Sequence, residues 1–118
     1  MQNRRHERVR ELLIRAVGEV IRKELSIEET GLVNVNDVVV GSDMHSAVVF
    51  VSILGDEAQR KKGMSTLRKK RKYLQTMVAQ NVLLKYSPAL RFQFDQAMER
   101  GNRVLQLIEE LEKNSPEE

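Results

Sequence analysis

The stretch that decides the fold is Arg60-Lys61-Lys62-Gly63-Met64-Ser65-Thr66-Leu67-Arg68-Lys69-Lys70-Arg71-Lys72-Tyr73-Leu74. Apolar residues on both sides of it follow a helical spacing, but that spacing fails between Leu67 and Leu74. In one continuous helix, Lys70 and Arg71 would lie on either side of Leu67 and turn toward the core, where two unpaired cations are too costly to bury. The sequence therefore predicts two helices, over about 57–69 and 71–86, with a bend or break near 68–72 that lifts these cations into water.

The same stretch concentrates the positive charge of the protein. Residues 60–72 include eight basic residues and no acidic one: Arg60, Lys61, Lys62, Arg68, Lys69, Lys70, Arg71 and Lys72. The whole chain has 20 Lys and Arg against 17 Asp and Glu, so the other 12 basic residues leave the rest of the chain at −5. Like charges without acidic neighbours repel one another and gain from neutralising phosphates, so the run is predicted to bind a polyanion such as nucleic acid rather than to be only a solvated helix face. Only Tyr73 lies beside the run, and base-specific recognition is not implied.

Two runs rich in β-branched residues precede this stretch. Leu32–Val40 and Ala47–Leu54 are predicted strands, and the turn formers of residues 41–46 join them into an antiparallel hairpin. Asp56 is predicted to cap the helix that follows by accepting a backbone N–H.

The first segment of the chain is predicted to be an amphipathic helix over about 4–25, ended by the acidic stretch of residues 26–30 and by Gly31. Glu11 precedes Arg15 by four residues and Glu19 precedes Lys23 by four, so most of this surface is expected to be self-paired. Three arginines at its exposed start are predicted as secondary contacts for the same polyanion: Arg4, Arg5 and Arg8.

After the basic stretch, Ser87-Pro88 is predicted to stop the second helix, and Leu90–Asp95 alternates as a strand with one buried face. A last helix is expected over about 98–113, where the apolar positions are Val104, Leu105, Ile108 and Leu111. Residues 114–118 are expected to form a flexible polar tail.

The predicted order is thus α-β-β-α-α-β-α, an α+β domain over residues 4–113 with helices packed on one face of a small mixed sheet of three strands. Six residues are predicted to build its core: Leu12, Val51, Leu74, Phe92, Phe94 and Ile108.

Several function classes lack support in the sequence. The chain has no Cys, and His6 and His45 are isolated, so neither a metal site nor a Ser-His-Asp or Cys-His arrangement is expected. No glycine pattern suits a phosphate loop, so no cofactor and no enzymatic activity are predicted. No apolar run approaches the roughly 20 residues that span a bilayer, and the cytoplasm is the expected compartment, without membrane association.

Two stretches carry a family resemblance. The first resembles the second-strand signature of the bacterial ribosome-binding factor A family and covers residues 43–56 (Asp43-Met44-His45-Ser46 through Ile53-Leu54-Gly55-Asp56). The second resembles the Pro-x-Leu-x-Phe-x-x-Asp…Gly segment of the same family and covers residues 87–101 (Ser87-Pro88-Ala89-Leu90-Arg91-Phe92 through Arg100-Gly101). The first helix and the closing helix match in place and length, so the resemblance covers about residues 4–112.

The resemblance implies a KH-like type II domain (α-β-β-α-kink-α-β-α) that lacks the Gly-x-x-Gly loop, and no two glycines here stand three apart. In its place the family has a kinked helix pair with small residues at the bend, where this chain has Lys70-Arg71-Lys72. The resemblance also implies a non-enzymatic factor that binds the free small ribosomal subunit and its rRNA late in maturation, assists processing of the rRNA 5′ end and supports growth in the cold.

We expect a monomer, with an assembly GTPase considered as a further partner. The alternative is a generic protein-interaction module, in which the closing helix docks a partner and the basic run only aids solubility. A small nuclease is a weaker alternative, since it would need clustered carboxylates to hold a metal.

Overall fold

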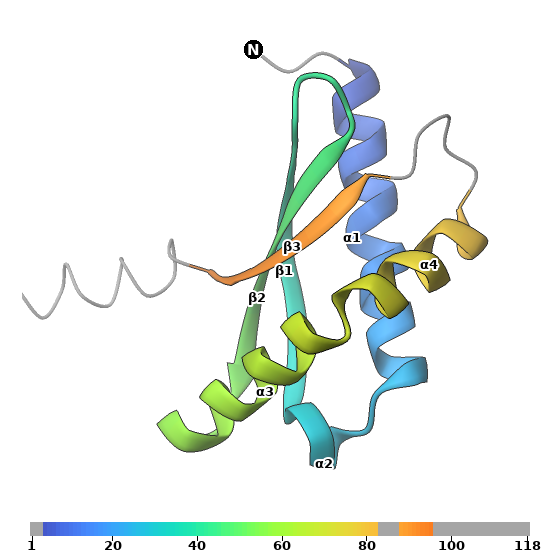
Figure 1. The fold of residues 1–118 in the computed structure, drawn as a ribbon. Helices are drawn as coiled ribbons and strands as arrows, with labels where there is room; N and C mark the ends of the chain where they lie inside the picture. Colours follow the sequence, from blue (N-terminus) through green and yellow to red (C-terminus); the bar gives the residue numbers. More distant parts are fainter. Residues whose placement is uncertain (1–3, 83–87, 96–118) are drawn as a thin grey trace, which may run out of the picture.

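The structure, a computed structural model, describes residues 4–82 and 88–95 of the 118-residue chain. The elements follow one another as α1 (Arg4–Glu24), α2 (Ile27–Thr30), β1 (Leu32–Val40), β2 (Ser46–Leu54), α3 (Glu57–Lys69), α4 (Arg71–Asn81) and β3 (Ala89–Phe94) (Figure 1). The bend predicted in the basic stretch is confirmed, with Lys70 as the single residue between α3 and α4.

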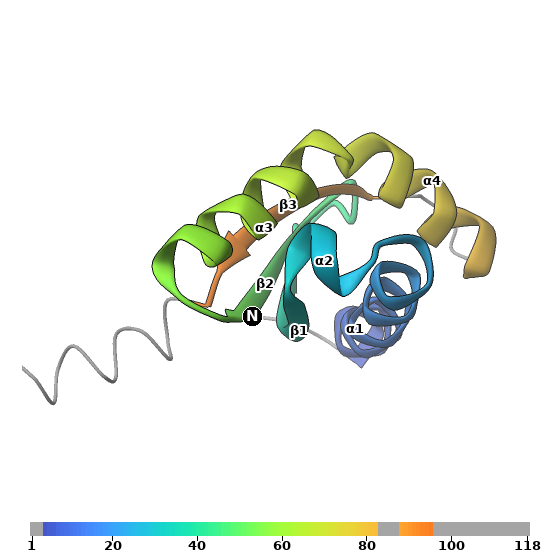
Figure 2. The same cartoon turned by 90° about the horizontal axis from the view of Figure 1, so that it is seen from below.

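The sheet has the order β1-β2-β3, with an antiparallel β1–β2 hairpin and β3 parallel to β2. Along β2, alternate side chains are buried: Ala47, Val49, Val51 and Ile53. The helices pack on the side of the sheet from which these side chains project, and Figure 2 shows α1, α2 and α4 grouped there. The parallel β3 runs beside the α3–α4 pair, so this pair is the crossover connection between β2 and β3. This confirms the α+β prediction of helices on a three-stranded mixed sheet.

The structure confirms three of the six predicted core residues. Val51 and Leu74 are fully buried and Phe92 is nearly so. Leu12 is only half-buried and lies outside the core cluster, because the buried stripe of α1 is centred on Leu13 and Val17 instead. Phe94 packs against the core but stays half-buried at the end of β3, and the predicted core residue Ile108 lies outside the described residues.

Several helix and strand boundaries differ from the sequence prediction. The second predicted helix ends at Asn81 instead of residue 86, because Val82 already has an extended backbone. The strand predicted over Leu90–Asp95 begins and ends one residue earlier, and β2 begins at Ser46. The helix expected over 98–113 and the tail over 114–118 lie outside the described residues.

One short helix was not predicted. Where a break was expected, α2 begins with a capping box at its N-terminus. Ser26 Oγ accepts from the Glu29 N–H at 3.1 Å, and the Ser26 N–H donates to Glu29 Oε1 at 3.0 Å. The Ser-x-x-Glu spacing is the sequence signal that could have identified it. This helix sits directly against α3, since a Cβ on Gly63 would lie 2.2 Å from the Thr30 carbonyl oxygen.

Candidate nucleic-acid interface

At the bend between α3 and α4, Lys70 forms a helical hydrogen bond to each helix. The Lys70 N–H donates to the Thr66 carbonyl at 3.0 Å, and the Lys70 carbonyl accepts from the Leu74 N–H at 2.8 Å. Leu67 before the bend and Leu74 after it are both fully buried. The bend therefore lets two apolar faces reach one core without turning the intervening cations into it, as the failed spacing indicated.

The cations at the bend are not simply lifted into water, and that part of the expectation is wrong. Lys70 Nζ lies 3.2 Å from Glu29 Oε2 of α2. Hydrogen bonds from the Ser26 backbone and from the Lys70 side chain hold the pKa of Glu29 below its ordinary value. A carboxylate remote in sequence thus supplies the partner that the basic run itself lacks.

Two arginines reach the outer edge of β3, the edge that does not pair with β2. Arg68 donates through Nε and Nη2 to the Phe92 carbonyl at 3.3 and 3.1 Å, and Arg71 Nη1 lies 3.5 Å from the Leu90 carbonyl. Gln75 completes this edge by accepting from the Leu90 N–H at 3.0 Å. An unpaired strand edge exposes backbone groups that favour unwanted pairing, so these side chains also have a structural role.

The other cations of the run point away from the core. Lys62, Lys69 and Lys72 are exposed, and no ion pair holds them within the part of the chain that the structure describes. Lys61 lies 3.9 Å from Glu57 one turn earlier, but both side chains are so exposed that the pair adds little stability. Arg60 lies over the Phe94 ring, with its guanidinium carbon 5.5 Å from the ring centroid.

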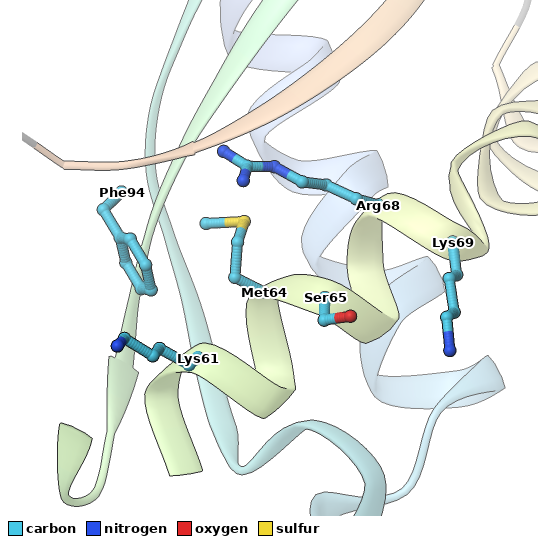
Figure 3. A pocket seen from close by; sticks show the side chains of 6 residues that line it. All are labelled: Lys61, Met64, Ser65, Arg68, Lys69 and Phe94. Atoms are coloured by element: carbon cyan, nitrogen blue, oxygen red, sulfur yellow. The ribbon is translucent and has the colours of Figure 1, made fainter. Parts of the chain in front are cut away.

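A hollow of about 450 Å³ opens between α3 and the end of β3 (Figure 3). Its lining combines cations with apolar surface: Lys61, Met64, Ser65, Arg68, Lys69 and Phe94. A second hollow, of about 400 Å³, lies on the other side of Arg68 and adds Arg71, Arg91, Phe92 and Gln93. Sequence reasoning placed Phe94 in the core and left out Arg91. The signals that could have found them are an aromatic residue ending the strand and a cation at an outward position of its alternation.

Tyr73, the aromatic residue beside the run, is turned toward α1. Its hydroxyl donates to the Glu24 carboxylate, and this hydrogen bond raises the pKa of Tyr73. The contact ties the start of α4 to the end of α1, so the hydroxyl of Tyr73 has a structural role.

The predicted secondary contacts lie elsewhere. Arg4, Arg5 and Arg8 are exposed at the start of α1, beside the β1–β2 turn, where His6 Nε2 is 3.3 Å from the Gly41 carbonyl oxygen (Figure 1). The structure therefore does not bring them together with the basic stretch.

The pairing expected along α1 is also different. Neither Glu11–Arg15 nor Glu19–Lys23 forms an ion pair among the described residues, and Arg10 Nε instead donates to Asp37 Oδ1 of β1 at 2.8 Å.

Within residues 4–82 and 88–95, no three His, Cys, Asp or Glu side chains gather as a metal site would require. Among the same residues, no helix combines the length and the apolar character that crossing a membrane would need.

Comparison with known proteins gives one consistent result. The family model described as ribosome-binding factor A matches residues 5–108. A ribosome-binding factor A from Halothermothrix orenii is 33% identical over 111 residues, which cover 94% of this chain and 91% of the relative. Another from Macrococcus caseolyticus is 34% identical over 110 residues, which cover 93% and 96%.

Solved structures agree. The crystal structure of ribosome-binding factor A from Thermus thermophilus superposes with a TM-score of 0.67 at 21% identity, covering 75% of this chain and 94% of that one. A homology model of the Thermus thermophilus factor, fitted into a cryo-EM map of its complex with the 30S subunit, gives 0.63 at 23% identity over 74% and 91%. The solution structure of a Thermotoga maritima relative gives 0.54 at 27% over 76% and 82%. The fold is KH-like, and the chain belongs to the ribosome-binding factor A family.

Proposed function

We propose that the protein is a non-catalytic assembly factor that binds the free small ribosomal subunit through its rRNA. In this proposal it acts late in maturation and assists processing of the rRNA 5′ end. Membership of the family supports the small subunit as the target, as does the 30S complex of the Thermus thermophilus relative. The observation that carries the RNA contact is the row of lysines on the outside of α3 and α4, Lys62, Lys69 and Lys72, beside the cationic hollow at Phe94.

The three lysines have the properties of phosphate contacts. They are exposed and carry no ion pair among the described residues, so binding would not first have to break an internal contact. Each phosphate that they neutralise releases condensed counterions, which favours association at low salt. Arg68 and Arg71 can join them, because a guanidinium has five N–H donors and the β3 carbonyls occupy only some of them.

The hollow beside Phe94 gives this surface more than charge. Met64 forms a buried apolar part of its lining, Phe94 presents a half-buried ring, and Lys61 and Lys69 border it (Figure 3). An unpaired base can stack against the part of this ring that Arg60 leaves exposed, while the neighbouring cations hold its phosphates. The arrangement favours RNA with accessible unpaired nucleotides over a perfect duplex.

Arg4, Arg5 and Arg8 remain a proposed secondary contact, for RNA that reaches the hairpin end of α1. We also propose action as a monomer in the cytoplasm. An assembly GTPase remains a further proposed partner, suggested by the family resemblance alone.

The test is co-sedimentation of the full chain with purified small subunits over a range of salt, with large subunits as the control. For about five neutralised phosphates, affinity for small subunits should fall with salt at a log–log slope of about −3.5 to −4.5. Association that does not change with salt, or that is equal for both subunits, would contradict the proposal and favour the protein-interaction alternative.

A further inference from the structure

The face of the sheet that points away from the helices is not covered by any described residue. Of the five large hydrophobic side chains exposed in the described part of the chain, three lie on this open face: Leu32, Val39 and Leu54. They belong to it because they alternate with residues that pack into the core, and because Leu32 pairs with Leu54 and Val39 with Val48 across the hairpin. An apolar surface of this kind commonly marks an interaction site.

The centre of the open face is also partly apolar. Val48 and Phe50 of the central strand are half-buried, and Phe50 lies in register with Asp37 on one side and Gln93 on the other. Arg91, in register with Val48, is exposed. The open face therefore offers apolar side chains toward both ends of β1 and β2, separated by the polar pair Asn34 and Ser52 and bordered by a cation on β3.

The residue that follows β3, Asp95, is held at this face by hydrogen bonds. The Asp95 N–H donates to the Val51 carbonyl at 2.8 Å, and the Asp95 carboxylate accepts from Asn36 Nδ2 at 2.7 Å. Ser52, whose side chain points to the open face, lies 3.4 Å from the same Asn36 side chain. Asp95 is thus tied to the open face, and 23 residues follow it in the sequence.

We propose that the C-terminal segment of this chain, residues 98–113, docks as an amphipathic helix on the open face of the sheet. Its apolar positions Val104, Leu105, Ile108 and Leu111 recur at a helical spacing and need an apolar partner. Sixteen helical residues span about 24 Å, and a nine-residue strand such as β1 or β2 spans about 30 Å. The segment is therefore long enough to cover most of the length of these strands from its anchor at Asp95.

Charge also favours this site. Residues 96–118 contain six acidic and three basic residues, and Glu109 and Glu112 lie beside the apolar positions, where they can meet the exposed Arg91. The competing docking site for this segment is the basic surface of α3 and α4, which would attract its acidic residues. The two hollows described on that surface are lined largely by cations, so the open face suits four apolar side chains better.

The absence of Cys in the sequence makes the test clean, because a single introduced cysteine takes a nitroxide label at one place. The label is placed at Glu110→Cys in the full chain, and line broadening of the backbone amides is measured by NMR. We expect the strongest broadening at Val48, Phe50 and Arg91, with weaker effects at Met64 and Leu67 on the other side of the sheet. The additional change Ile108→Asp should abolish this pattern, whereas Lys113→Gln, which leaves the apolar and acidic positions intact, should retain it.

Three outcomes would overturn the inference. Strongest broadening at Lys69 and Lys72 would place the acidic segment on the basic surface. Broadening that appears only when spin-labelled and isotope-labelled chains are mixed would make the occupant a second copy. Uniformly sharp lines would leave the segment undocked. Val39→Asp provides an independent check, because this exposed residue can change while the core stays intact, and it should also release the segment. No RNA is present in these measurements, so their failure would not affect the proposed function.

Discussion

The two sides of the α3–α4 pair use the same residue types for different purposes. On the inner side, Arg68 and Arg71 bind carbonyls of the β3 edge and Lys70 binds Glu29. On the outer side, Lys62, Lys69 and Lys72 are exposed and unpaired within the described residues. A count of charges in the sequence treats all six alike. The contacts show that half of them help to hold the fold, and the outer three are the ones whose exposure suits a role in binding alone.

The largest effect should come from the outer side. Replacing Lys62, Lys69 and Lys72 together by Gln removes three phosphate contacts, each worth about 0.7–0.9 in the logarithm of the binding constant at 0.1 M salt. Affinity for small-subunit rRNA should therefore fall by about 100- to 500-fold, while the urea midpoint stays the same or rises slightly. The matched control replaces three exposed cations of α1, Arg15, Arg22 and Lys23, by Gln. Equal losses in both variants would mean that net charge, and not this surface, determines binding.

Substitutions on the inner side of the α3–α4 pair should lower the free energy of unfolding. Gly63 lies where α3 touches α2, and a Cβ there would meet the Thr30 carbonyl oxygen at 2.2 Å and Ile53 Cδ1 at 3.0 Å. Gly63→Ala should therefore cost about 2–3 kcal/mol in the free energy of unfolding, measured by urea titration. Gly18→Ala is the control: the nearest atom to its Cβ would be 3.4 Å away, so helix propensity should make it neutral or stabilising. A stable Gly63→Ala protein would show that α3 is free to shift.

A smaller loss is expected for Arg68→Met, which keeps the aliphatic stem and removes the donors to the Phe92 carbonyl. The free energy of unfolding should fall by about 1–2 kcal/mol, toward the low end for a hydrogen bond to a charged group because Arg68 is exposed. Lys72→Met removes a cation from the outer side and should leave stability unchanged. If both variants unfold at the same urea concentration, the structural role assigned to Arg68 is wrong.

The smallest effect concerns the pairing of Glu29 with Lys70 and its dependence on pH. The pKa of Glu29 is lower in the folded protein than in the unfolded chain, mainly through the Ser26 N–H and then through Lys70. The stabilisation by its carboxylate is therefore complete above the ordinary glutamate pKa of about 4.3 and is lost as the pH falls through the lower folded value. Urea midpoints of the wild type and Glu29→Gln should differ at pH 7 and converge in acid. A constant difference would mean that ionisation of Glu29 contributes nothing.

Much of the fold could be predicted because its signals are local. The apolar stripe of α1, the β-branched runs of the hairpin and the failed spacing at Lys70 each depend on neighbouring residues. The missed features depend on residues far apart in the sequence. Arg68 meets Phe92 from 24 positions away and Lys70 meets Glu29 from 41, so no pattern within the basic run could separate the inner cations from the outer ones. Leu12 was misplaced because the stripe of α1 is wide enough to hold a half-buried flank.

The division between the two sides is tested most directly by how steeply binding depends on salt. The log–log slope of affinity for small-subunit rRNA is measured for the wild type and for the variant with Lys62, Lys69 and Lys72 replaced by Gln. The wild type should give about −3.5 to −4.5, and the loss of three contacts should make the slope shallower by about 2–3. An unchanged slope in the variant would contradict the claim that these outer lysines neutralise RNA phosphates.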